Sequence, residues 1–182
     1  VLVITNGIWT YTPTLSAVQI PSFDSDLNAG IETTNQYLCA LDFGGLADPL
    51  SINGVPFSQV NTVGAGTGTD TNPEFSGVDE NFGGSWTLTG TNSGAGGIAS
   101  LDNDFPGTVG TQADGNLQSL LTDVIFLNGA PQVGDSMTLT LGGLTPSATY
   151  ALRFYYRMWD GNRPVDFTFN GQGTDETVRV DE

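Results

Sequence analysis

The chain has 182 residues, of which 20 are acidic and four are basic, and its formal net charge is −16 at pH 7. It has no His, and its four basic residues are all Arg, at positions 153, 157, 163 and 179. The missing residue types exclude imidazole proton transfer, His metal ligands, Schiff-base chemistry and His-activated nucleophiles. The negative charge argues against nucleic acid as a partner, because phosphates would be repelled. We therefore expect a binding or structural module and not an enzyme.

The chain opens at Val1 directly into strand-like sequence, which suggests removal of an export signal. No stretch reaches the roughly 20 apolar residues that a membrane span needs, so we expect no membrane insertion. Cys39 is the only cysteine, which excludes an intramolecular disulfide. Its apolar neighbours predict a packed, inert thiol. We expect a secreted, extracellular protein at the cell surface.

Short runs rich in Thr, Val and aromatic residues are separated by turn-forming residues, including 25 Gly and 9 Pro. Short strand-like runs separated by turn residues, without a sequence repeat, are typical of an all-β sandwich. The expected strands are, in chain order, residues 1–4, 8–11, 36–43, 56–60, 85–89, 137–141, 149–159, 165–170 and 177–180. One short helix is expected near 116–127, where Leu117, Leu120, Leu121 and Val124 recur at helical spacing between Asp114 and Asn128-Gly129. These elements predict a single antiparallel β-sandwich domain over residues 1–182.

A hairpin is expected near the C-terminus, because residues 149–159 and 164–170 flank the turn sequence Asp160-Gly161-Asn162-Arg163. A four-residue loop would place Phe154 opposite Phe169, with other apolar pairs on the same face. It would place Arg157 opposite Asp166 on the polar face. This register predicts a cross-strand Arg157–Asp166 ion pair.

Four segments carry a resemblance to known proteins: residues 37–44 (YLCALDFG), 52–57 (INGVPF), 144–146 (LTP) and 152–157 (LRFYYR). They resemble a jelly-roll-like, carbohydrate-binding-module-like β-sandwich of secreted and cell-surface bacterial proteins. The resemblance covers roughly residues 30–182 and implies an exported, non-catalytic role. Modules of this type continue past the part resembling residues 178–182 into one or two further strands, so the resemblance implies a sandwich that lacks its final strand.

A missing strand would leave unpaired backbone groups and an apolar slot. The slot could be filled by a neighbouring copy that donates its Val1-Leu2-Val3-Ile4 run, giving a head-to-tail contact that propagates into a filament. Alternatively, the polypeptide itself supplies the strand beyond residue 182. The first alternative predicts self-association into a homo-oligomer or filament.

Calcium is the cofactor that the acidic loops suggest, because Ca²⁺ prefers carboxylate, amide and carbonyl oxygens. The candidate ligands lie in two loops: Asp102, Asn103 and Asp104 in one, and Asp24, Asp26 and Asn28 in the other. Residues 79–81 and 160–162 are further acidic loops, and none of the four completes an EF-hand. For any single loop, Asx-turns and solvated carboxylates are the favoured explanation.

Glycan recognition would need an exposed aromatic ring beside polar groups. The candidate site is Trp159 with Asp160, Asn162 and Arg163 at the end of the expected hairpin. Trp86, which alternates with Leu88, is expected in the core instead. The two functional hypotheses are an assembling surface or filament subunit, which we prefer, and a carbohydrate-binding module of a secreted polysaccharide-acting protein.

Overall fold

The computed structural model describes residues 2–4, 25–44, 50–60, 74–91, 97–101, 116–127, 134–145, 148–155, 165–169 and 176–180. Within them, the chain is built mainly of strands and has one short α-helix, which confirms the all-β prediction at this level. The elements in chain order are β1 (Leu2–Ile4), the 3₁₀ helix η1 (Asp26–Asn28), β2 (Leu41–Phe43), β3 (Ser51–Ile52), β4 (Val55–Pro56), β5 (Ser58–Val60), β6 (Glu74–Val78), β7 (Ser85–Thr91), β8 (Ile98–Leu101), α1 (Asn116–Thr122), β9 (Val124–Leu127), β10 (Ser136–Leu141), β11 (Val165–Phe169) and β12 (Glu176–Val180).

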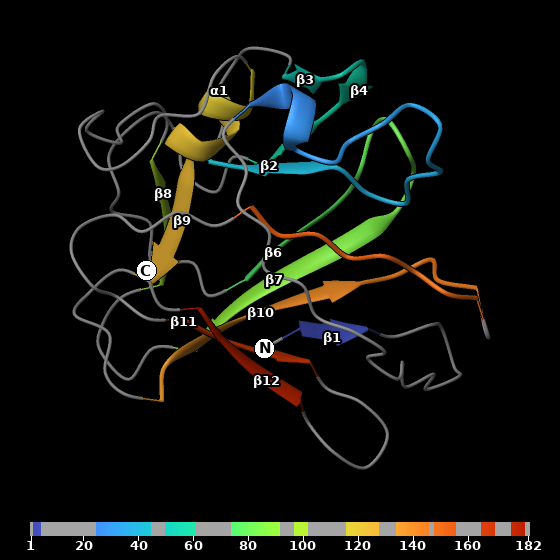
Figure 1. Cartoon of the computed structure of the whole chain (residues 1–182). Helices are drawn as coiled ribbons and strands as arrows, with labels where there is room; N and C mark the ends of the chain where they lie inside the picture. The colour runs from blue at the N-terminus through green and yellow to red at the C-terminus, as the bar shows by residue number, and fades with distance from the viewer. Residues whose placement is uncertain are drawn as a thin grey trace.

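The largest assembly is a six-stranded sheet in the order β12-β11-β1-β10-β7-β6 (Figure 1). Its β6–β7, β7–β10 and β11–β12 pairs are antiparallel, whereas β1 runs parallel to both β10 and β11. The sheet is therefore mixed: the predicted antiparallel pairing is found in three of its five strand pairs, and the two pairs made by β1 are parallel. Parallel neighbours need a long connection, and β1 lies more than a hundred residues before either partner in the sequence.

Three two-stranded ladders complete the described strands: β2–β5 is parallel, and β3–β4 and β8–β9 are antiparallel. The β3–β4 hairpin turns at Asn53-Gly54, whose φ angles are +50° and +82°. Two left-handed residues of this type form the two-residue turn that matches the twist of a hairpin. Asn-Gly was a readable hairpin signal, but the strand prediction began only at Pro56.

The helix is shorter than predicted, because α1 ends at Thr122 and Val124 begins strand β9. Residues 124–127 read Val-Ile-Phe-Leu, a β-branched and aromatic run that favours a strand. They pair with β8 at four positions, from Leu101↔Val124 to Ile98↔Leu127. Four ladder pairs therefore override the helical spacing of Val124.

The predicted C-terminal hairpin is also wrong. Residues 148–155 form no strand, and both neighbours of β11 are other elements, β12 and β1. Asp166 lies opposite Arg179 instead of Arg157, which lies outside the described residues. The β12 sequence alternates Thr177 and Arg179 with Val178, so it satisfies the same polarity test as the predicted partner. Alternation alone could not distinguish the two pairings.

The structure confirms several of the other predicted strands, some of them only in part. Those at 1–4, 85–89, 137–141, 165–170 and 177–180 are confirmed within a residue or two at each end. The strand expected at 36–43 covers only Leu41–Phe43, and the one at 56–60 is divided at Phe57. β6 and β8 were not predicted, and residues 8–11 lie outside the described residues.

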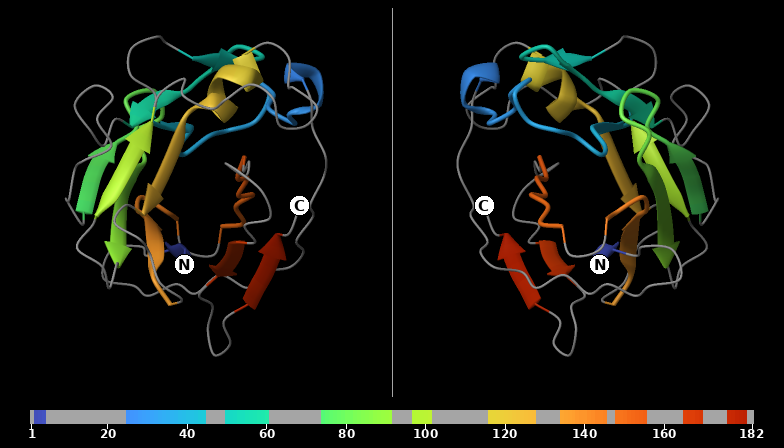
Figure 2. Two further views of the ribbon diagram at one scale, coloured as in Figure 1. Left: turned by 90° about the vertical axis from the view of Figure 1, so that its left-hand side faces the viewer. Right: turned by 90° about the vertical axis from the view of Figure 1, so that its right-hand side faces the viewer.

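The main hydrophobic cluster lies where α1, η1 and the β3–β4 hairpin gather at one end of the molecule, while β11 and β12 lie at the opposite end (Figure 2). Its buried members are Ala29, Ile31, Ala40, Leu50, Ile52, Val55, Phe57, Leu117 and Leu120. A second contact brings β7 against the β8–β9 ladder. A Cβ on Gly90 would lie 2.7 Å from Ile98, so only glycine allows this close approach of β7 to β8.

Candidate functional site

The most deeply buried carboxylate of the described residues belongs to Asp79, which is 0% exposed. One oxygen, Oδ2, accepts a 2.6 Å hydrogen bond from the Ala40 N–H. The other, Oδ1, accepts from the Ser58 hydroxyl at 2.7 Å and from the Asn81 and Phe82 N–H groups at 2.8 and 3.1 Å. A buried charge is tolerable only when it is satisfied in this way. Asp79 therefore ties three separate segments of the chain together.

The same residue closes the turn that joins β6 to β7. Its N–H donates to the Gly84 carbonyl at 2.8 Å, and its carbonyl accepts from the Gly83 N–H at 2.7 Å. Gly84 also donates to the Leu38 carbonyl at 3.1 Å. A Cβ on Gly84 would overlap that carbonyl and the Cys39 sulfur, so the turn can approach residues 38–40 only through glycine.

Ser58, which is 8% exposed, stands beside Asp79 in an arrangement that superficially resembles an activated nucleophile. Its hydroxyl donates to the Asp79 carboxylate and accepts from the Glu80 N–H at 3.1 Å and the Asn81 side-chain amide at 2.9 Å. The chain contains no His to take the hydroxyl proton at neutral pH. All three contacts instead hold the 79–82 turn on β5, which is a structural function.

Cys39 lies next to this cluster and is partly buried. Burial and, to a smaller extent, the nearby Asp79 charge together raise the pKa of its thiol to about 11. The thiol is therefore protonated at neutral pH and a poor nucleophile. This agrees with the expectation of an inert thiol, although Cys39 precedes β2 and does not lie within a strand.

Asp26, one of the predicted calcium ligands, lies in η1 and holds the start of α1. Its Oδ1 accepts from the Leu117 N–H at 2.7 Å and its Oδ2 from the Asn116 N–H at 3.2 Å. These are two of the N–H groups that a helix leaves without an internal partner, and a carboxylate there also meets the positive end of the helix dipole. Asp26 thus serves as a helix cap supplied from 90 residues earlier in the chain.

Asn28, the second predicted ligand in η1, accepts from the Ser25 N–H through Oδ1 at 3.1 Å. Asn53 strengthens the same region, because its side-chain amide donates to the Asp26 carbonyl at 2.6 Å and the Ile31 carbonyl at 3.0 Å. The Asn116 amide donates to the Ser51 carbonyl at 2.7 Å. The sequence analysis missed these contacts of Asn53 and Asn116, because the carbonyl groups that the two amides reach lie far away in the sequence.

The remaining candidate ligands and the predicted glycan site lie outside the described residues. They are Asp24, Asp102, Asn103 and Asp104 for calcium, and Trp159, Asp160, Asn162 and Arg163 for glycan. Of the residues predicted to mediate assembly, Val1 also lies outside, whereas Leu2, Val3 and Ile4 form β1. The structure brings β1 into the middle of the sheet of its own chain.

Aromatic side chains occur on the segment just before the predicted glycan site. Tyr150 and Phe154 are 43% and 37% exposed, and the Phe154 ring lies 5.5 Å from that of Phe167. Between them, the Arg153 side chain donates to the Ala29 carbonyl at 2.6 Å. The Tyr155 hydroxyl donates to the same carbonyl at 2.5 Å, and burial raises the pKa of that phenol. This segment therefore links the η1 end of the molecule to β11.

Trp86, expected in the core, is half-buried and meets the Phe43 ring edge-on at 6.1 Å. Its Cα partner on β6 is Gly77, where a Cβ would lie 2.8 Å from the indole. Leu88, two residues on, is 3% exposed. The alternation predicted for this strand is thus confirmed for Leu88 and only partly for Trp86.

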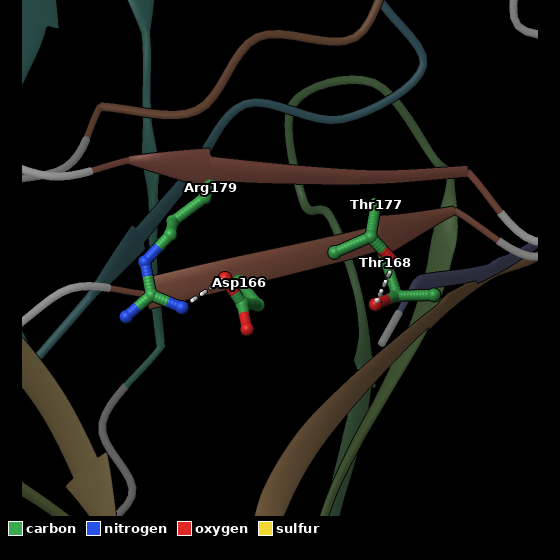
Figure 3. A network of polar contacts seen from close by, with 4 residues as sticks. All are labelled: Asp166, Thr168, Thr177 and Arg179. Carbon is green, nitrogen blue, oxygen red and sulfur yellow. Dashed lines mark hydrogen bonds and ion pairs between the residues drawn. The ribbon is translucent and has the colours of Figure 1, made fainter.

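The exposed face of β11 and β12 carries two polar cross-strand pairs (Figure 3). Arg179 and Asp166 form an ion pair at 3.5 Å, and the Thr168 and Thr177 hydroxyls are 3.0 Å apart. Both charged side chains are more than half exposed. Such pairs fix register and contribute little energy.

Within the described parts of the chain, no group of three or more His, Cys, Asp and Glu could hold a metal ion. Among the same residues, no helix has the length and apolar character needed to cross a membrane. No family model matches the chain, and neither a curated protein nor a solved structure matches it.

Proposed function

We propose that this protein is a non-catalytic, extracellular structural subunit that assembles with copies of itself. The observation that carries the proposal is the position of β1. Strand β1 lies inside the six-stranded sheet, parallel to both neighbours, and four residue pairs join it to them among the described residues. A strand held in this way is an element that copies of a protein can share.

The chemistry of the described polar groups supports a structural role. The Asp79 carboxylate is saturated by N–H and O–H donors from its own chain, and the Asp26 carboxylate caps α1. Neither is presented to a substrate. The chain also has no His or Lys that could activate a nucleophile.

A β-sandwich architecture, export to the cell surface and a stabilising role for Ca²⁺ belong to the same proposal. The close approach of Gly90 to Ile98, which stacks β8 on β7, supports two layers. The net charge of −16 supports calcium, because carboxylates on neighbouring copies repel one another and a shared divalent cation would relieve that repulsion.

The first test is the mass of the purified chain by light scattering, measured in Ca²⁺ and again in chelator. We expect oligomers larger than the 19.1 kDa chain that do not depend on any sugar. Dissociation in chelator would support a calcium-dependent assembly. A monomer in both conditions at high concentration contradicts the proposed function.

A carbohydrate-binding module is the second candidate, and the exposed Tyr150 and Phe154 rings beside Arg153 favour it. Aromatic faces stack on sugar rings, and polar neighbours bind hydroxyls. Its test is the tryptophan fluorescence of the chain during titration with soluble polysaccharides, with Trp159→Phe as the variant and Trp86→Phe as the matched control. Saturable binding that only Trp159→Phe abolishes would favour this function over assembly.

A further inference from the structure

We propose that β1 is exchanged between copies, so that Leu2–Ile4 of one copy occupies the position between β10 and β11 of a second copy. This inference rests on the proposed self-assembly and specifies its mechanism. The partner is therefore a second copy of this chain, and the surface that receives it is the pair of backbone edges of β10 and β11.

The receiving position has the width of one strand. Besides β1, β10 pairs with β7 and β11 pairs with β12, but β10 and β11 do not pair with each other. Because neighbouring strands lie about 4.8 Å apart, removal of β1 leaves two edges about 10 Å apart that face one another. Both edges would then present unpaired backbone groups, which are a template for pairing with another strand.

Strand β1 connects the two parts of the sheet, although its ladders with both neighbours are short. Among the described residues, β1 has three partners on β10, namely Leu139, Thr140 and Leu141, and one on β11, namely Phe169. Without β1 the sheet separates into the β11–β12 pair and the three strands β10, β7 and β6. Since a two-stranded unit is marginally stable in water, an occupied slot is strongly favoured.

The source of the occupying strand makes no difference to the sheet, because a second copy would form the same backbone pairs. Twenty-one residues, 5–25, separate β1 from η1 in the sequence, and a chain of that length spans at most about 75 Å. The number of residues in this connection is therefore compatible with β1 pairing in a neighbouring molecule. Exchange in one direction produces head-to-tail chains, and reciprocal exchange produces dimers.

Cross-strand cysteines test the exchange. Val3 and Thr140 are Cα partners, and the spacing of adjacent strands falls within the Cα–Cα range that a disulfide accepts, about 4.4–6.8 Å. In a Cys39→Ser background, one protein carries Val3→Cys and a second, distinguished by a mass tag, carries Thr140→Cys. The two are refolded together and oxidised, so a disulfide between the two positions can form only across copies. We expect the mixed disulfide-linked species on a non-reducing gel.

Two further variants make each outcome decisive. A single chain that carries both Val3→Cys and Thr140→Cys reports whether β1 pairs within its own copy. Thr89→Cys replaces Thr140→Cys as the control, because Thr89 lies on β7, one strand further from β1. The inference is overturned if the mixture forms no more linked species than this control while the double variant closes within one chain. If light scattering still shows oligomers in that case, only the exchange fails, whereas monomers throughout would remove the proposed function as well.

Discussion

At the scale of single residues, Asp79 and Asp26 act as internal ties. Each carboxylate accepts hydrogen bonds from parts of the chain far away in sequence: Asp79 from Ala40 and Ser58, and Asp26 from Asn116 and Leu117. Hydrogen bonds to a charged acceptor are stronger than neutral ones, and the loss of one partner leaves buried donors unsatisfied. Acidic residues that looked like loop ligands in the sequence therefore stabilise the fold.

Substitution Asp79→Asn tests this function. The amide keeps one acceptor oxygen but turns its own donor towards groups that now donate to the carboxylate, so we expect the free energy of unfolding to fall by at least about 2 kcal/mol. Urea unfolding followed by tryptophan fluorescence measures it. Glu80→Gln is the matched control, because the neighbouring Glu80 side chain is exposed, and its effect should stay within about 0.5 kcal/mol. Equal stability of the two variants would contradict the assignment.

Cys39 gives a prediction that depends on pH. With its thiol pKa raised to about 11, alkylation of the folded protein at pH 8 should be about 100-fold slower than in urea, where the thiol has its ordinary pKa. Since the folded-state pKa lies above the unfolded one, the corresponding contribution to stability is intact below about pH 9 and is lost as the pH rises towards 11. Labelling with iodoacetamide measures the rate. Equal rates in buffer and urea would show that the thiol is not shielded.

At the scale of elements, neighbours decide structure where local sequence is ambiguous. Residues 124–127 continue a helical spacing but form β9, because β8 offers four ladder partners. Residues 165–169 could pair with either of two alternating segments, and they pair with β12 and β1. In both cases the local pattern permits two structures and the available edge selects one.

The register of β11 and β12 can be tested with a double-mutant cycle. Asp166→Asn and Arg179→Gln should show a small coupling of about 0.2–0.5 kcal/mol, because the 3.5 Å pair is well exposed. The same cycle with Arg157→Gln in place of Arg179→Gln should show no coupling. Coupling of Asp166 to Arg157 alone would restore the hairpin predicted from the sequence.

At the scale of the whole molecule, electrostatics opposes self-association. A net charge of −16 makes copies repel at low ionic strength, and salt screens this repulsion over a Debye length of about 10 Å at 0.1 M. An assembly held by shared strands gains little from charge attraction. Its equilibrium should therefore shift towards larger species as salt is added.

Light scattering should accordingly report a higher mean mass in about 500 mM NaCl than in about 20 mM NaCl at equal protein concentration. Sucrose at matched osmolality is the control, because it adds no charge. A mass that falls with added salt would indicate contacts between opposite charges, for example Arg179 with carboxylates of a second copy, and would argue against association through strand exchange.

The sequence by itself determined the composition-level properties and the local elements. The absent His and Lys exclude whole classes of chemistry, and alternation and turn residues located the strands at 85–89, 137–141 and 165–170. Only the tertiary structure decided that β1 lies between β10 and β11, that Asp79 is buried and that Asp26 caps α1. The physical reason is range. Propensity and alternation act over a few residues, whereas strand pairing and the satisfaction of a buried carboxylate depend on groups that only the folded chain brings together.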